Sequence, residues 1–141
     1  MPIESNKQLV LQLIEDFWNQ GNLTAADDLV ASAVLRESMK NANSLFHDVF
    51  SDLCFEPQEL IGEEDKVVAR YLMSGSYVPR WFGLARPARP FAIDYIAIYR
   101  FSESKIKGFV FLRDNLVLLR QLGLPAVLNI LLRYGKRLGG V

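Results

Sequence analysis

Few side chains in this sequence could act as an acid or a base near neutral pH. His47 is the only histidine, and histidine is the residue whose ordinary pKa lies in that range. It stands next to Asp48 and is offset from the apolar helical face that contains Phe46. This position favours a solvated helix surface, so His47 is a weak candidate for a general base.

Asp114 is the carboxylate best placed for catalysis, because it ends the last predicted strand. It also directly precedes a predicted amphipathic helix over residues 115–123. An aspartate at that position commonly accepts hydrogen bonds from the first free backbone N–H groups of the helix. Capping would hold the carboxylate ionised, so the sequence favours capping over proton transfer and leaves both roles open.

Four tyrosines fall on alternate positions of two predicted strands, in phase with each other and out of phase with charged residues such as Arg70 and Arg100. These tyrosines are Tyr71, Tyr77, Tyr95 and Tyr99. Successive side chains of a strand point to opposite faces, so outward charges put these phenols on the inner face. A phenol there can donate a hydrogen bond to a carbonyl or epoxide oxygen and stabilise developing negative charge. The alternative is that each ring packs in the core with a wet hydroxyl.

Apolar side chains from several predicted elements could form a pocket for a flat or polycyclic substrate. They are Trp18, Phe46, Phe50, Met73, Trp81, Ala97, Phe109 and Phe111. Core packing explains most of them equally well. Trp81 differs because it lies in a loop rich in Pro and Arg, over residues 78–90, where a mobile aromatic lid is plausible. Phe109 and Phe111 have the parity to share a face with Ala97, so the middle of the predicted pocket is apolar.

Hydrophobic periodicity places three helices in the first part of the chain. Helical spacing follows Ser5, whose combination with Gln8 is a capping-box pattern, and ends near Gly21. A short helix follows over residues 24–31, and a third is predicted around residues 42–50.

Strand patterns follow these helices over residues 54–61, 66–77 and 91–101, and a last strand follows a turn at residues 102–104. Pro57 places the first strand at an edge or a bulge. Helices followed by a run of antiparallel strands indicate an α+β fold, with the helices on one face of a curved sheet.

The composition limits the functions of the chain. Its 141 residues, 50% hydrophobic and 23% charged, fit one globular domain with a sizeable core. Sixteen basic and sixteen acidic residues cancel, so no overall charge favours nucleic acid. With one cysteine, Cys54, and one histidine, we expect no disulfide, no metal and no cofactor. The lone cysteine and the lack of a signal-peptide pattern predict a cytoplasmic protein.

Five short segments, in this order and spacing, resemble those of the SnoaL-like polyketide cyclases. They are residues 16–22 (DFWNQGN), 65–71 (DKVVARY), 74–76 (SGS), 98–101 (IYRF) and 118–123 (LLRQLG). Each is weak by itself, but together they cover residues 6–123. The resemblance implies the cone-shaped fold of the nuclear transport factor 2-like superfamily, commonly dimeric, with a pocket between helices and sheet. Members cyclise polyketides by aldol chemistry, while relatives hydrolyse epoxides, isomerise steroids or only bind ligands.

The positions that usually carry the family's polar catalytic groups best match Ala97, Phe109 and Phe111 here, and Ile14 replaces a tyrosine common in relatives. The sequence therefore predicts a cyclase that closes a ring on an apolar intermediate by shape control and tyrosine hydrogen bonding. A non-catalytic small-molecule-binding protein is the alternative. An epoxide hydrolase or isomerase is a third reading, and it would need Asp114 as its carboxylate.

Residues 124–141 extend beyond the resemblance, so we divide the chain into a cone domain, 1–123, and a helical extension, 124–141, of the same domain. Pro125 can begin a helix, and basic residues near its end suit the helix dipole. The outer face of the sheet is predicted to be apolar and to need a cover, which the extension or a homodimer partner would supply. Contact of residues 125–137 with a membrane surface is a less favoured alternative.

Overall fold

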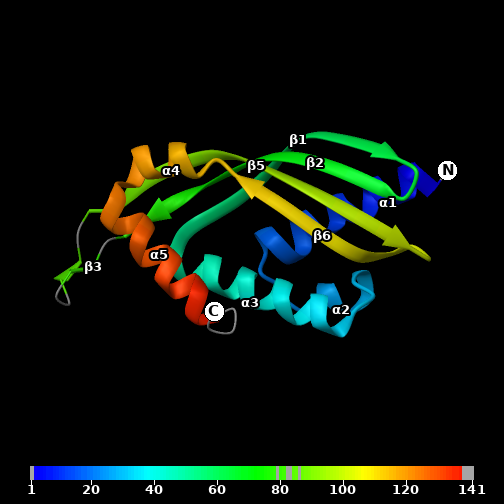
Figure 1. Ribbon diagram of the computed structural model, residues 1–141, viewed down its shortest axis with the longest axis horizontal. Helices are drawn as coiled ribbons and strands as arrows, with labels where there is room; N and C mark the ends of the chain where they lie inside the picture. The colour runs from blue at the N-terminus through cyan, green and yellow to red at the C-terminus, as the bar shows by residue number, and fades with distance from the viewer. Residues whose placement is uncertain (1, 79, 82–83, 86, 138–141) are drawn as a thin grey trace.

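The computed structural model describes residues 2–78, 80–81, 84–85 and 87–137. Four long strands form one antiparallel sheet in the order β1-β2-β5-β6. Their bounds are β1 Phe50–Glu63, β2 Lys66–Tyr77, β5 Arg89–Ser102 and β6 Lys105–Arg113. The connection between β2 and β5 carries a small hairpin of β3 (Arg80–Trp81) and β4 (Leu84–Ala85). Figure 1 shows the sheet curving over the helices.

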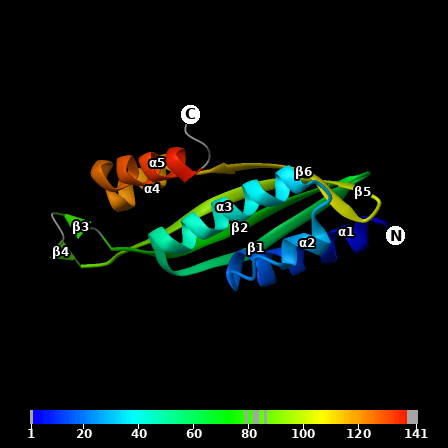
Figure 2. The same ribbon diagram turned by 90° about the horizontal axis from the view of Figure 1, so that it is seen from below.

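The helices gather mainly on the concave face of this sheet, as Figure 2 shows. Their bounds are α1 Pro2–Gln12, the π-helix η1 Leu13–Asn19, α2 Ala25–Leu29, α3 Ala33–Val49, α4 Asn115–Leu122 and α5 Leu124–Arg137. Side chains from η1, α3, β1, β2 and β5 make the buried core between the two layers. The predicted α+β architecture, with helices on one face of a curved antiparallel sheet, is confirmed.

Two helices begin earlier than the sequence pattern predicts. The first begins at Pro2, so Ser5 lies inside α1 and is not its cap. The third begins at Ala33, where the side chain of Ser32 accepts a hydrogen bond from the Leu35 N–H at 3.3 Å. The first turns of α3 are largely exposed, so they carry little of the apolar periodicity by which a helix is recognised.

The strand register agrees with the predicted alternation. Ala97 pairs with Phe111, and Tyr99 pairs with Phe109. The strand β5 alternates buried and exposed residues along its inner length. Pro57 lies on the edge strand β1, next to a register shift between Pro57 and Glu59, as its missing N–H requires.

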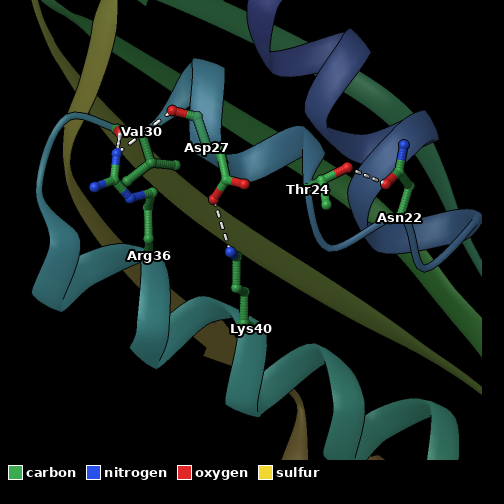
Figure 3. A network of polar contacts seen from close by, with 6 residues as sticks. All are labelled: Asn22, Thr24, Asp27, Val30, Arg36 and Lys40. Carbon is green, nitrogen blue, oxygen red and sulfur yellow. Dashed lines mark hydrogen bonds and ion pairs between the residues drawn. The ribbon is translucent and has the colours of Figure 1, made fainter.

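Polar contacts tie α2 and the residue that follows it, Val30, to α3 (Figure 3). The Lys40 ammonium lies 2.7 Å from a carboxylate oxygen of Asp27, and this hydrogen bond and charge lower the pKa of Asp27. The Arg36 guanidinium donates to the backbone carbonyl of Val30 at 3.2 Å. Val30 in turn forms an isolated parallel bridge with Ile106 on β6. These contacts hold the helices against the edge strand at this end of the sheet.

The extension is helical but does not cover the outer face of the sheet. The helix α5 packs against α3 and α4, where Ala126 and Ile130 are buried. The Asn129 amide also donates to the Tyr77 hydroxyl at 2.9 Å, which fixes α5 to the end of β2. Among the described helices, none has the length and apolar character needed to cross a bilayer.

The outer face of β5 and β6 is apolar and exposed, as predicted. Ile96 pairs with Leu112 and Ile98 pairs with Val110, and these side chains are 36–71% exposed. Four adjacent apolar side chains of this kind form a patch that water solvates poorly, so a protein partner is expected to cover it. A homodimer across this patch stays a prediction.

We predict that Val110→Glu combined with Leu112→Glu weakens self-association, because two carboxylates would have to be desolvated within the patch. The expected change is a dissociation constant at least about tenfold larger, measured by sedimentation equilibrium. Val34→Glu is the matched control, since Val34 is 81% exposed but lies on α3, away from the patch. Equal association of the double variant and wild type, or a monomeric wild type, would contradict this interface.

Candidate functional site

The candidate site is built around the π-helix η1, which directs the Trp18 side chain into the core. In η1, the Gln20 N–H donates to the Glu15 carbonyl at 3.0 Å, and the Gly21 N–H donates to the Phe17 carbonyl at 3.1 Å. The turn buries neighbouring residues in pairs: Leu13 with Ile14, and Phe17 with Trp18. π-Helical turns of this kind occur often at functional sites.

Side-chain hydrogen bonds join η1 to α3 and to β1. From α3, the Asn43 amide donates to the Phe17 carbonyl at 2.8 Å. From η1 itself, Asn19 binds the backbone of Phe55 on β1 twice, accepting from its N–H at 2.6 Å and donating to its carbonyl at 2.9 Å. These bonds fix the orientation of Trp18 between α3 and the sheet.

His47 belongs to the same support. Its Nε2 lies 2.8 Å from the Trp18 carbonyl oxygen, and because a carbonyl can only accept, Nε2 carries the proton in this bond. The prediction that His47 lies on a solvated helix surface is wrong, since its side chain is half-buried. The sequence does not reveal this contact because the partner is a backbone carbonyl 29 residues earlier.

Eight aromatic rings form what we call the central cluster on the concave face. Its members are Trp18, Phe46, Phe55, Tyr71, Tyr95, Tyr99, Phe109 and Phe111. The Trp18 ring centroid lies 6.4 Å from that of Phe46 and 6.0 Å from that of Phe109. The six rings from η1, α3, β1, β2 and β5 are buried, while Phe109 and Phe111 on the edge strand are partly exposed. Solvent therefore reaches the cluster along β6.

Three phenols of the central cluster are buried together. Tyr71, Tyr95 and Tyr99 are at most 1% exposed, and the Tyr71 and Tyr95 rings stack with centroids 4.8 Å apart. Burial, with the neighbouring Tyr99 and Tyr95, raises the pKa of Tyr71 well above its ordinary value. Burial likewise raises the pKa of Tyr99 to about 12, although Tyr71 and Trp18 act in the opposite direction. Both phenols are thus neutral hydrogen-bond donors near pH 7.

Two donors in this region have no partner. The Tyr99 hydroxyl lies close enough to the Trp18 indole N–H and the Tyr71 hydroxyl for both to influence its pKa, but neither the Tyr99 hydroxyl nor the Trp18 N–H forms a hydrogen bond of good geometry with a described residue. A buried polar group without a partner destabilises a fold, so such a group is expected to bind a water molecule, an ion or a ligand atom. The pair could donate to one oxygen atom of a ligand.

Asp114 acts as a helix cap. Its Oδ1 accepts a hydrogen bond from the Val117 N–H at 3.1 Å, at the start of α4. Its own N–H donates to the Asp94 carbonyl at 3.2 Å, so the backbone is held as well. The capping role that the sequence favoured is confirmed, and a role in proton transfer stays a prediction.

Arg113 is a site residue that the sequence pattern did not predict. It follows Phe109 and Phe111 on the same face of β6 and pairs with Tyr95 across the strands. Its guanidinium carbon lies 5.4 Å from the centroid of the Phe46 ring. Strand parity alone would have indicated it, since Arg113 is two residues after Phe111. The concave face therefore carries a positive charge at the end of the cluster, next to the predicted apolar stretch.

The other predicted site residues lie apart from the central cluster or beside it. Phe50 and Tyr77 line a cleft of about 360 Å³ at the end of β2, together with His47 and Asn129. The Tyr77 hydroxyl is bonded to Asn129, so this tyrosine does not join the other three. Met73 and Ala97 are buried on the inner face of the sheet.

The predicted aromatic lid cannot be placed. Trp81 belongs to β3, where it pairs with Leu84, but its side chain, and Phe82 and Gly83 altogether, lie outside the described residues. Within the described chain, no three side chains of His, Cys, Asp or Glu gather in a way that could hold a metal ion.

Comparison of the sequence with protein families gives one match. Residues 8–122 match the model of the family described as SnoaL-like polyketide cyclase. No curated protein sequence matches the chain significantly.

Solved structures share this architecture. TsrD from Streptomyces laurentii is 25% identical with a TM-score of 0.70, and the match covers 85% of this chain and 96% of TsrD. IdmH, a proposed polyketide cyclase from Streptomyces antibioticus, is 21% identical with a TM-score of 0.72, over 84% and 99% of the two chains. A proposed SnoaL-like polyketide cyclase from Jannaschia sp. CCS1 is 14% identical with a TM-score of 0.74, over 89% and 96%.

The raised pKa of Tyr99 predicts how stability depends on pH. Its folded value of about 12 exceeds the ordinary value of 10.0, so its contribution is complete below pH 10 and is lost as pH rises through about 12. This difference corresponds to roughly 3 kcal/mol. Tyr99→Phe should therefore make the fall of unfolding free energy between about pH 9 and pH 12 shallower, measured by urea denaturation. An absorbance titration counts the phenols that ionise late in the folded protein. If Tyr99→Phe changed neither that number nor the slope of unfolding free energy against pH, the raised pKa would not belong to Tyr99.

His47 is predicted to support the fold through the Trp18 carbonyl. His47→Leu leaves that carbonyl without its donor, which should lower the unfolding free energy by about 1–3 kcal/mol. His47→Gln is the matched variant, because its amide can still donate, and it should lose less. Urea denaturation at neutral pH measures both, and equal stability of His47→Leu and wild type would show that the bond is unimportant.

Proposed function

The chain belongs to the SnoaL-like polyketide cyclase family, and on this basis we propose that it closes a ring on an apolar, polyketide-type intermediate held at the central cluster. The observation that carries the proposal is the pair of unpartnered donors, the Tyr99 hydroxyl and the Trp18 indole N–H, buried among aromatic rings. They supply hydrogen bonds where a substrate oxygen would otherwise be desolvated without compensation.

Two kinds of ring closure fit donors without a base. A pericyclic closure redistributes electron pairs within the substrate and moves no proton. An intramolecular epoxide opening breaks one C–O bond, and the oxygen that takes up the electron pair gains a proton while the attacking hydroxyl of the same substrate loses one. In either reaction, protonated phenols stabilise negative charge that develops on oxygen. An aldol closure would need a base, and Tyr71 and Tyr99, with raised pKa values, are poor bases near pH 7.

The rest of the rate enhancement would come from the shape of the aromatic surface. Holding a flexible chain with its reacting atoms in contact removes much of the entropy cost of ring closure. Phe109 and Phe111 stack with centroids 5.4 Å apart and are partly exposed, so their rotation would admit a substrate to the buried phenols. Trp18, fixed by η1, would form the rigid side of the same surface.

A non-catalytic binding protein is the second candidate, favoured by the apolar residues Ala97, Phe109 and Phe111 at positions where a catalytic group was expected. It predicts stoichiometric ligand binding without product. Hydrolase or isomerase chemistry at Asp114 is the third, and it would require the carboxylate to leave its helix cap, where Oδ1 is already bonded to the Val117 N–H.

Tyr99→Phe tests the proposal directly. Removing an unpartnered buried hydroxyl should leave the protein as stable as wild type or more so, while kcat/KM falls by about 10–100-fold. Turnover would be followed by chromatographic separation of cyclic and open isomers from a panel of poly-β-ketone and polyene epoxide chains. Unaltered kcat/KM in a folded Tyr99→Phe protein would contradict the mechanism.

Asp114→Asn is the companion variant, because asparagine also caps helices well. We expect it to retain both stability and turnover. If Asp114→Asn abolished turnover and Tyr99→Phe did not, the carboxylate chemistry of the third candidate would replace the mechanism proposed here. Binding by wild type without any product across the panel would favour the binding protein.

A further inference from the structure

Arg113 carries a charge that nothing in the described protein neutralises. Its Nη1 is shielded from solvent and forms no hydrogen bond with a described residue, while the side chain as a whole is partly exposed. No ion pair links it to a described carboxylate. The adjacent carboxylate, Asp114, holds the start of α4. The face of the Phe46 ring, 5.4 Å away, is its one attractive partner of known position.

This arrangement is costly for a free protein. A guanidinium stays charged at any physiological pH, and removing one of its N–H groups from water without a hydrogen bond is unfavourable. A cation–π contact with phenylalanine offsets only part of that cost. The remaining exposed part of the side chain means that a ligand can reach it from the edge of the sheet. An anion that accepts from the buried Nη1 would complete its hydrogen bonding.

We propose that Arg113 binds a carboxylate of the substrate, so that the ligand of the central cluster is an apolar acid and not a neutral compound. The inference rests on the proposed function only in taking the central cluster as the ligand site. A planar carboxylate matches the fork of a guanidinium and can accept two parallel hydrogen bonds.

The position of Arg113 orients such a ligand. Phe46 contacts both the guanidinium and, at 6.4 Å between centroids, Trp18. Tyr95, the cross-strand partner of Arg113, stacks on Phe111 at 5.4 Å and on Tyr71 at 4.8 Å. An acid held by Arg113 would therefore lay its apolar body along these rings and direct its far end toward the unpartnered Tyr99 and Trp18 donors. The same residues would thus select the substrate and set which end reacts.

A carboxylate is present before the reaction, whereas an enolate or alkoxide oxygen would exist only during turnover. The two sources of negative oxygen can be separated by a ligand that cannot react. Naphthoate and its neutral counterpart naphthamide have nearly the same shape and aromatic body, and they differ in charge. Isothermal titration calorimetry of the full chain with each compound measures the preference for the acid.

We expect wild type to bind naphthoate at least about tenfold more tightly than naphthamide. Arg113→Gln should reduce this preference to about twofold or less with little effect on naphthamide. Arg113→Lys keeps the charge but not the forked guanidinium, so its preference for naphthoate should lie between those of wild type and Arg113→Gln. Arg100→Gln is the matched control, because it removes the same charge from an exposed position on the outer face of β5, and it should keep the full preference.

Equal binding of the acid and the amide by wild type would overturn the inference, as would a preference that Arg113→Gln leaves intact. Thermal unfolding of each variant confirms that it is folded, and Arg113→Met, which keeps the apolar stem, replaces Arg113→Gln if the latter is not. The outcome is independent of catalysis. A preference for naphthoate that depends on Arg113, in a protein with no turnover, would defeat the cyclase and leave the carboxylate site standing.

Discussion

The position of Trp18 depends on side chains that bind the backbone carbonyls of η1. The Gln20 N–H reaches back five residues to the Glu15 carbonyl, and the carbonyls of Phe17 and Trp18 accept from the side chains of Asn43 and His47. These two residues are one helical turn apart on α3, so a single face of that helix holds a single turn of η1. Asn19 links η1 to the sheet by two hydrogen bonds with the backbone of Phe55 on β1. The helix layer, the sheet and the central cluster are thereby fixed to one another at one place.

The sheet and its inner face could be predicted from the sequence because charges mark the outside of each strand. Arg70 and Asp94 lie 3.5 Å apart on the outer face, and their parity puts Tyr71 and Tyr95 inside. The contacts of η1 with α3 and β1 could not be predicted in the same way. A π-helical turn has no clear sequence signature, and its partners are side chains bonded to backbone, so neither His47 nor Asn43 can be paired from the sequence. The position of Arg113 could be predicted only in part. Strand parity places its side chain on the inner face, but a charged side chain at the end of a strand is ordinarily expected in water.

The central cluster contains buried hydrogen-bond donors that lower the stability of the fold and could bind a ligand. Its rings give the protein a large buried aromatic surface, which favours folding. The same burial deprives the Tyr99 hydroxyl and the Trp18 indole N–H of water without giving either a protein partner. A core selected for stability alone would place phenylalanine at position 99, because the ring would pack equally well without an unsatisfied hydroxyl. The retained phenol is more readily explained by a ligand oxygen than by packing.

The polar groups of the concave face also constrain the chemistry that the proposed function can include. Tyr99, Trp18 and Arg113 all carry hydrogen-bond donors without a described partner, and the raised pKa values keep Tyr71 and Tyr99 protonated near neutral pH. His47 donates its Nε2–H to a backbone carbonyl, which makes Nδ1 its basic nitrogen, and Asp114 accepts from a backbone N–H, and neither residue belongs to the central cluster. The central cluster, composed of donors and apolar rings, can stabilise charge on a substrate oxygen but supplies no base that would generate a carbanion. The reactivity must then reside in the substrate, as it does in a strained epoxide or a polyene, and the protein would determine its conformation and the site of bond formation.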